Sequence, residues 1–581
     1  MLKNAQYVTI IITGYNLWPK VRFMGQAIGF LLDSFYWLKE AFFRLRVRFV
    51  RAVGPLRAAG LKQKIVTLII VMLAAAVSLF IAKQVASSIG GANQTLLESL
   101  SDFKIPAMVI LGSLFFIFII IKPFEAFICW IFFAPLLENR PLGFQLLTFN
   151  RIALGVILFS TIIRKLAAGR KQGGVHFGFL DAAIFLFTAI CFASVLLARP
   201  DIGAMEANLT YYKGTALGKI AAAKNFKDAF YSFADHILYG FIAFYIVRNL
   251  IDTRRKVVIV LAAVASLCIY LTPIGVLEHF TGKTFFRTLL TEELAYRDVN
   301  RAAGPFENPS VYGTVLGMGL IFAIHLYFQT ASGFRRFLCL AAIFLIGVGE
   351  VMTFTRAAWL SPILAFLVMT ALYKGRRKQL VVWLSVGIIA LIAAFPLIRS
   401  SEFYKKRITS TRELEARLYV AHQQRLMFLD KPLLGFGFGN FDYYKYDYPI
   451  YVKEAPDIRV GTGSHNTFVT ILVETGIAGF APYFLAFVLI FAQFWGAYRR
   501  RDLSDADKRL LVAVAAASVC YIATGFVVDF RHFRYVEYLF WGNMALILVV
   551  RSIVVKEASS HKEIEPATDQ SLQRRVRAAA S

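Results

Sequence analysis

Three basic residues lie close to the ends of long apolar segments, where a polar side chain is expected to have a binding partner or a function. Arg301 precedes one apolar segment, Arg356 lies between two segments with almost no loop, and His465 ends a long polar stretch. An arginine fork can hold phosphate with two hydrogen bonds, and a histidine can accept a proton near neutral pH. These residue types therefore indicate chemistry on a phosphate-bearing substrate.

Each of the three also has an ordinary structural explanation. An arginine at the end of a membrane helix can extend to the lipid headgroups, and a single histidine is more often structural. Placing a charged side chain next to hydrocarbon nevertheless costs about 2.5–3.5 kcal/mol of free energy on insertion scales. Arg356 is therefore expected to have a partner of opposite charge or a function. The functional interpretation rests on all three residues falling on one predicted side of the membrane.

The elements that must position these residues are predicted from composition. Hydrophobic residues make up 58% of the 581-residue chain, charged residues make up 17%, and mean hydropathy is +0.60, values far from those of a soluble domain. Apolar runs of about 17–25 residues recur, and each can cross a hydrocarbon core as a helix. We expect an all-α polytopic membrane bundle of about 12–14 transmembrane helices with one large helical outer loop. The candidate spans are 65–81, 105–121, 123–137, 151–163, 179–197, 236–247, 257–276, 310–328, 337–354, 357–373, 380–398, 477–498, 510–528 and 535–555.

The formal net charge of +28 comes from basic residues grouped in short segments between apolar runs. These groups fall on alternate loops, as the positive-inside rule predicts for cytoplasmic loops, so the charge does not indicate a nucleic-acid partner. Both termini are then cytoplasmic, and the three basic residues above face the periplasm. The five cysteines lie within apolar runs without paired spacing, which favours small core residues over disulfides or metal ligands.

The chain is expected to have five parts. Residues 1–64 form a basic, aromatic segment typical of an amphipathic element on the cytoplasmic headgroups. Residues 65–399 form the first part of the bundle, 400–476 the large periplasmic loop with the catalytic motifs, and 477–555 the last transmembrane helices. The polar tail, 556–581, is expected to be cytoplasmic and disordered.

The segment 466–498 is too long for a single span, and Gly476, Gly479 and Pro482 interrupt it. Glycine weakens a helix. We therefore expect a short helix from Asn466 to Thr475 at the outer interface, with the membrane span beginning near Ile477.

The predicted outer loop is rich in aromatic and basic residues. Aromatic faces can pack on sugar rings and arginines can hold phosphate, so Arg417 and Arg425 are candidate substrate-binding residues. The alternative is an interfacial aromatic belt with ordinary surface charges. The three glycines within 435–439 are expected to form tight turns, with Asn440 supporting a left-handed conformation.

Four short patterns resemble those of the O-antigen ligase and O-antigen polymerase superfamily of bacterial surface-polysaccharide enzymes. The resemblance extends from about Ile105 to Val555 and is strongest from Arg301 onward. The amino-terminal extension before Ile65 is not part of the family pattern. The four patterns are Arg301 with Gly304 and Asn308-Pro309, the Thr355-Arg356 turn, KPLLGFGFGNF at 431–441, and His465-Asn466 followed by Glu474-Thr475-Gly476 and Gly479.

The resemblance implies transfer of a glycan from undecaprenyl diphosphate to an acceptor at the periplasmic face of the inner membrane. The acceptor is lipid A core in ligases and another lipid-linked repeat in polymerases. Family enzymes work without a metal, and no other cofactor is implied. Membrane lipids are expected partners, and polysaccharide-export proteins are candidate partners.

The resemblance also suggests a role for each matching residue. Arg301 and Arg356 would clamp the diphosphate, with Arg417 or Arg425 assisting, and a single displacement would invert the anomeric centre. His465 would either accept the acceptor's proton or hydrogen-bond the diphosphate. Asn308, Asn466 and Glu474 belong to the substrate-binding motifs, although the position of Glu474, nine residues after His465, also favours an arginine-pairing or structural role.

Two other functions are compatible with a basic polytopic protein. A lipid-linked oligosaccharide transporter or flippase would usually show internal repeats and charged or broken helices near the midplane, and the sequence shows no such repeat. A non-catalytic component of an exopolysaccharide export complex is the other alternative. Within the enzyme class, ligase, polymerase and protein glycosyltransferase remain open.

Overall fold

The helices follow the apolar segments closely. The computed structural model describes residues 116–137, 148–167, 178–197, 230, 233–282, 301–306, 308–400, 412–445 and 464–579. The predicted span 65–81, most of 105–121 and the amino-terminal segment 1–64 lie outside these residues. The chain divides into two units, 1–77 with 166–169 and 78–165 with 170–581.

No strand occurs in the described part of the chain, which is all-α. Most predicted spans within it correspond to helices whose ends differ by five residues or fewer, but the helix over 477–498 begins at Thr467 and the helix over 535–555 continues to Ala579. The elements are α5 (Pro123–Leu137), α6 (Phe149–Ala167), α7 (Phe179–Leu197), the π-helix η2 (Ala234–Leu238), α11 (Tyr239–Leu250), α12 (Arg254–Thr281), α14 (Pro309–Gln329), α15 (Gly333–Met352), α16 (Arg356–Leu372), α17 (Arg377–Ser400), α18 (Arg412–Asp430), α19 (Phe441–Tyr444), α21 (Thr467–Tyr498), α22 (Asp505–Gly525), the 3-10 helix η5 (Phe530–His532) and α23 (Arg534–Ala579).

Among the described residues, five helices are long and apolar enough to cross a membrane: α12, α14, α21, α22 and residues 534–559 of α23. Shorter apolar helices occur at α5, in α7 and at α16. Large apolar side chains lie on the outside of the bundle, such as Phe334 at 71% exposure and Phe344 at 74%. Their exposure to water would be unfavourable, so this surface is expected to face lipid. The chain is therefore a multi-pass membrane protein.

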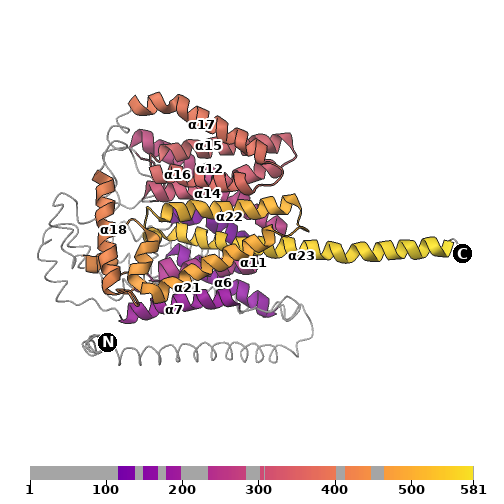
Figure 1. Ribbon diagram of the computed structural model, residues 1–581, viewed down its shortest axis with the longest axis horizontal. Helices are drawn as coiled ribbons and strands as arrows, with labels where there is room; N and C mark the ends of the chain where they lie inside the picture. The colour runs from indigo at the N-terminus through magenta and orange to yellow at the C-terminus, as the bar shows by residue number, and fades with distance from the viewer. Residues whose placement is uncertain are drawn as a thin grey trace, which may run out of the picture. The chain divides into compact units, whose positions relative to one another are not determined.

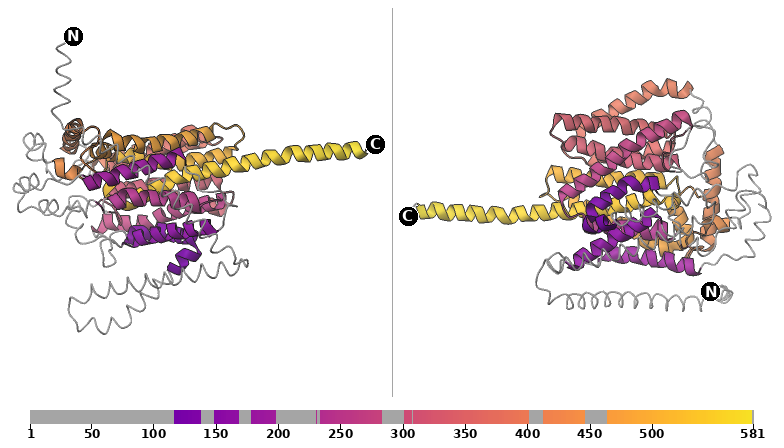
Figure 2. Two further views of the ribbon diagram at one scale, coloured as in Figure 1. Left: turned by 90° about the horizontal axis from the view of Figure 1, so that it is seen from below. Right: turned by 180° about the vertical axis from the view of Figure 1, so that it is seen from behind.

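The long helices run side by side in alternating directions, so their ends form two groups (Figures 1 and 2). The basic loops meet at one end, where Arg254 Nη1 lies 2.6 Å from Asp507 Oδ1 and Arg509 Nη1 donates to Lys374 O at 3.3 Å. We call this the basic end and the opposite one the site end. Helix α18 lies across the helices at the site end (Figure 1).

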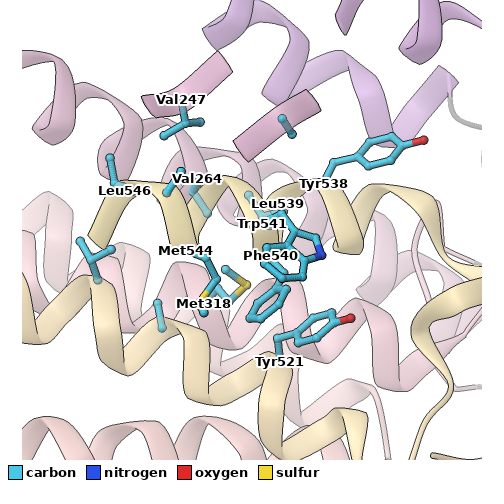
Figure 3. Close-up of a cluster of buried hydrophobic side chains, with 14 of the residues drawn as sticks. Val247, Val264, Met318, Tyr521, Tyr538, Leu539, Phe540, Trp541, Met544 and Leu546 are labelled. Atoms are coloured by element: carbon cyan, nitrogen blue, oxygen red, sulfur yellow. The ribbon is translucent and has the colours of Figure 1, made fainter. Parts of the chain in front are cut away.

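Aromatic side chains from several helices fill the interior. Trp541 and Phe540 of α23 pack with Tyr521 of α22 and Met318 of α14 (Figure 3). The rings of Tyr521 and Phe540 stack with centroids 3.7 Å apart. Gly240 of α11 allows Trp541 to approach, because a Cβ there would lie 2.9 Å from the indole. Such close packing is what holds membrane helices together where water cannot drive association.

The carboxyl-terminal tail differs from expectation. A disordered segment was predicted from residue 556, whereas α23 continues as a helix to Ala579. The segment is rich in Ala, Glu, Lys, Gln and Arg, which are good helix formers. Polar composition was therefore not sufficient evidence of disorder.

Candidate functional site

Arg301 and Arg356 belong to one assembly at the site end. The half-buried side chain of Arg301 donates from Nε to Thr353 O at 3.4 Å, and its Nη2 donates to Thr355 Oγ1. Thr355 occupies the N-cap position of α16, so Arg356, the first residue of that helix, follows directly and is exposed. The backbone is fixed as well, since Ala302 N donates to Met352 O at 3.0 Å. Arg301 is therefore hydrogen-bonded to the turn that directly precedes Arg356, although the two arginines are 55 positions apart in the sequence.

The end of α12 holds the Arg301 loop in place. Glu278 is buried, and its Oε2 accepts hydrogen bonds from Ala303 N at 3.0 Å and Gly304 N at 2.8 Å. Gly304 has φ +57°, which suits glycine. The next residue of α12, His279, stacks on Phe354 with ring centroids 5.0 Å apart. One helix end thus supports both the loop of Arg301 and the turn of Arg356.

His465 lies at the start of α21, in a half-buried position. Its pKa is lowered to about 4, first by burial and then by the positive charges of Arg417 and Lys445, while the negative charge of Asp529 opposes the shift. The imidazole is consequently neutral near pH 7, the form that can accept a proton. Asn466 is the N-cap of α21, because its Oδ1 accepts from Val469 N at 3.0 Å.

Helix α18 is hydrogen-bonded to the start of α21. Gln424 is buried, and its Nε2 donates to Ser464 Oγ at 2.9 Å and to Thr470 Oγ1 at 3.0 Å. The same helix carries the exposed Arg417 and Arg425. The positive charge of Arg417 is close enough to lower the pKa of His465.

Helix α21 is broken at Gly476, where φ is +61° and ψ is −170°. The break lies between the two helices that were predicted from the sequence. The loop 431–441 lies against it, with Gly437 N donating to Glu474 O at 2.7 Å and Ile477 N to Pro432 O at 2.9 Å. A Cβ on Gly476 would lie 2.3 Å from the Leu433 carbonyl group. The glycine-rich loop therefore closes the backbone hydrogen bonds that the broken helix leaves open.

The loop glycines Gly435, Gly437 and Gly439 have φ of +66°, +91° and +81°, as tight turns require. The left-handed conformation expected at Asn440 is wrong, because its φ is −103°. The glycines before it complete the turns. Its Nδ2 instead donates to Phe436 O at 3.1 Å, which closes the loop on itself.

Glu474 is fully buried and bonds to the same loop. Its carboxylate accepts from Gly439 N at 2.8 Å and from Phe441 N at 2.9 Å, and it pairs with Arg531. Arg531, itself 5% exposed, also forks onto Asp529 with Nε–Oδ1 at 2.9 Å and Nη2–Oδ2 at 2.7 Å. Glu474 is thus an internal anchor, with an arginine partner.

Sequence reasoning missed Glu278, Asp529 and Arg531. Each stands at the predicted outer end of a span, next to apolar residues. That is the same signal that singled out Arg356, and it would have identified them too. The signal does not contain the long-range partners: Glu278 bonds to Ala303, 25 positions away, and Arg531 pairs with Glu474, 57 positions away.

Contacts link the arginine turn to the His465 region. Phe306, at the end of the Arg301 loop, packs on Tyr535 with ring centroids 5.8 Å apart. Tyr535 follows η5, whose Phe530 N donates to Thr467 Oγ1 at 2.9 Å, two residues after His465. All three predicted chemical residues therefore lie at the site end. Asn308 is the N-cap of α14 there, since its Oδ1 accepts from Ser310 N at 2.8 Å.

The arrangement offers several guanidinium groups and a neutral imidazole at one end of a membrane bundle. Guanidinium groups can hold an anionic group, and the imidazole can take up a proton. No curated protein matches the chain. Residues 340–484, about a quarter of the chain, match the O-antigen ligase family model, and this region contains Arg356, Arg417, Arg425, His465, Asn466 and Glu474. Residues 340–484 of this multi-pass helical membrane protein are therefore similar to the O-antigen ligase family.

Proposed function

We propose that the protein is a glycosyltransferase that moves a glycan from undecaprenyl diphosphate to an acceptor hydroxyl. The transfer takes place at the site end of the bundle, on the periplasmic face of the inner membrane, with both termini in the cytoplasm. It needs neither a metal nor another cofactor. The acceptor is lipid A core or a growing polysaccharide.

The observation that carries this proposal is the joint anchoring of Arg301 and Arg356. The leaving diphosphate gains negative charge as the glycosidic bond breaks, and fixed cations are the groups that stabilise such charge. Arg301 is fixed by Thr353 and Thr355, so its guanidinium does not have to be ordered when the donor binds. Arg417 on α18 adds positive charge near His465, and Arg425 is exposed on the same helix.

The reaction balances without a co-reactant. The acceptor oxygen forms a bond to the anomeric carbon as the bond from that carbon to the diphosphate oxygen breaks. The diphosphate leaves with the electron pair, and His465 takes the proton from the acceptor hydroxyl. A single displacement of this kind inverts the anomeric centre.

The proposal is tested by substituting Arg301, Arg356 and His465 singly by alanine, followed by analysis of surface glycan. Loss of attachment supports a ligase, and loss of chain length with attachment intact supports a polymerase. Arg336→Ala is the matched control, because this arginine is exposed at the basic end. Unchanged glycan in all three variants, at normal protein levels, would rule out the catalytic proposal and leave a transporter or a non-catalytic export component.

A further inference from the structure

A second buried charge cluster lies at the site end, in residues that the proposed mechanism does not use. Arg151, near the start of α6, forks onto Asp235 of η2 with Nε–Oδ1 and Nη2–Oδ2 distances of 2.6 Å each. Their side chains are 5% and 1% exposed. This bidentate pair largely neutralises the carboxylate of Asp235.

A second arginine reaches the same carboxylate with one nitrogen. Arg534, the first residue of α23, places Nε 2.7 Å from Asp235 Oδ2, and its side chain is 31% exposed. That contact is the only hydrogen bond or ion pair of Arg534 in the described part of the chain. The side chain is thus held at Nε, while both terminal amino groups remain available for an acceptor.

The local charge favours an anion. Two guanidinium groups share one carboxylate, which leaves a net charge of +1 in the cluster. Helices α6 and α23 also begin here, and the positive ends of their dipoles add to it. An arginine at a helix start is electrostatically unfavourable unless an anion compensates it.

Buried aromatic rings connect Arg534 to the candidate site. Tyr535 follows Arg534 and packs against Phe306 of the Arg301 loop and against Trp130, both at 5.8 Å between ring centroids. All three rings are buried, so they fix the position of Arg534 within the protein. Arg534 therefore lies beside the candidate site, on the side formed by α5 and α23.

We infer that Arg534 binds a phosphate of a lipid-linked substrate, with Asp235 orienting the guanidinium and Arg151 neutralising Asp235. This inference rests on the proposed function for the nature of the substrate. The phosphate belongs either to the polyprenyl diphosphate donor or to a phosphorylated acceptor glycolipid. Planar two-pronged recognition by the terminal amino groups is the feature that lysine lacks.

The test measures binding without turnover, on the full-length protein in nanodiscs. The probes are geranylgeranyl diphosphate, a diphosphorylated lipid A disaccharide, and the dephosphorylated form of each. We expect Arg534→Gln to weaken binding of one phosphorylated probe about tenfold or more, as loss of a charge-assisted hydrogen bond does. Arg534→Lys should have an intermediate effect. The probe that is affected identifies the source of the phosphate.

Arg248→Gln is the matched control. Arg248 also pairs with one carboxylate, Asp181, at 32% and 3% exposure, but at the opposite end of α11. Unchanged affinity of Arg534→Gln for both phosphorylated probes would overturn the inference. So would an equal loss for the dephosphorylated lipids, which would indicate a structural effect. If the glutamine variant does not fold, Arg534→Lys decides the question in the same way.

The proposed glycosyltransferase mechanism and the inference about Arg534 can be contradicted independently of each other. A protein that binds the probes through Arg534 but shows no role for Arg356 or His465 in glycan transfer would contradict only the proposed mechanism. A protein that transfers glycan through those residues, with Arg534→Gln binding as the wild type does, would contradict only this inference.

Discussion

Arg531 is the cation of a fully buried cluster that also contains Glu474 and Asp529. Without it, two carboxylates would remain in the interior with no positive partner in the cluster. Breaking a buried pair in this way costs about 3–5 kcal/mol. We expect Arg531→Met to lower the free energy of unfolding by that amount, measured by denaturation of the purified protein in detergent.

Arg254 provides the control for that prediction. It also faces two acidic residues, Asp507 at 2.6 Å and Glu557 at 3.7 Å, but its side chain is 38% exposed. Exposed ion pairs contribute less than about 1 kcal/mol, so Arg254→Met should change stability much less. Equal effects of the two substitutions would show that burial is not what makes the Arg531 cluster important.

The depressed pKa of His465 predicts a pH profile. Its pKa in the folded protein is about 4, so the imidazole stays neutral well below pH 6.5. The acid limb of kcat/KM, which reports the free enzyme, should therefore lie nearer 4 than 6.5. Arg417→Gln removes a charge that lowers this pKa, so it should move the acid limb to higher pH.

The same group affects stability with a definite sign. Below pH 6.5 the unfolded chain takes up a proton at this histidine that the folded chain does not accept until near pH 4. Stability should therefore fall with decreasing pH over that window, and His465→Gln should reduce the fall. An acid limb near 6.5 that Arg417→Gln does not move would contradict both the assignment of His465 and its contact with Arg417.

At the scale of the elements, the last turn of α12 positions the Arg301 loop. Glu278→Ala leaves two backbone N–H groups of that loop without their acceptor. We expect a marked loss of glycan transfer, because Arg301 is then less firmly held, and a stability loss of about 1–3 kcal/mol per unsatisfied group at most. Glu278→Gln retains an oxygen acceptor and should recover part of the activity in the same assay. Equal activity of the wild type and the alanine variant would show that the loop is held by other contacts.

The contact between α14 and α16 supplies a second test at this scale. A Cβ on Gly313 would lie 2.3 Å from the Cβ of Ala358, two residues after Arg356. Gly313→Ala must push the helices apart, at about 1–3 kcal/mol, and should reduce both the melting temperature and transfer. Gly347→Ala is the control, since nothing lies within 4 Å of its Cβ position. A melting temperature as high in Gly313→Ala as in the control would contradict this packing.

At the scale of the molecule, the two ends of the bundle should face different compartments. The basic end is expected in the cytoplasm by the positive-inside rule, so the site end should face the periplasm. A membrane-impermeant maleimide should label Leu429→Cys on α18, which is 61% exposed, in intact spheroplasts. It should label Lys378→Cys, exposed at the start of α17, only after permeabilisation. The reverse pattern would place the site end in the cytoplasm.

The helices were the most predictable part of the fold. The limits of α5 and α7 agree with the predicted spans, and the break at Gly476 separates the two helices expected there. These features depend on local composition, because every membrane-crossing helix must satisfy its own backbone hydrogen bonds. The carboxyl-terminal tail was mispredicted for a related reason, since a polar segment can still have high helix propensity.

The candidate site was predictable only as a set of residues on one side of the membrane. Arg301, Arg356 and His465 do lie at one end, but the sequence contains no sign that Arg301 would bond to Thr355 or that Arg417 would lie near His465. Asn308 and Asn466 were proposed as substrate ligands, and the structure also gives each an N-cap role. Their substrate contacts remain predictions.

By itself, the sequence determined that the chain is a multi-pass helical membrane protein with family motifs at predictable span ends. Hydrophobicity, charge bias and glycine positions are properties of short segments, so they can be evaluated without a fold. Only the tertiary structure decided which charges compensate one another: Glu474 with Arg531, Glu278 with the Arg301 loop, and Asp235 with both Arg151 and Arg534. Those pairings depend on which helix faces meet, and in a low-dielectric interior they determine which cation remains available for a substrate.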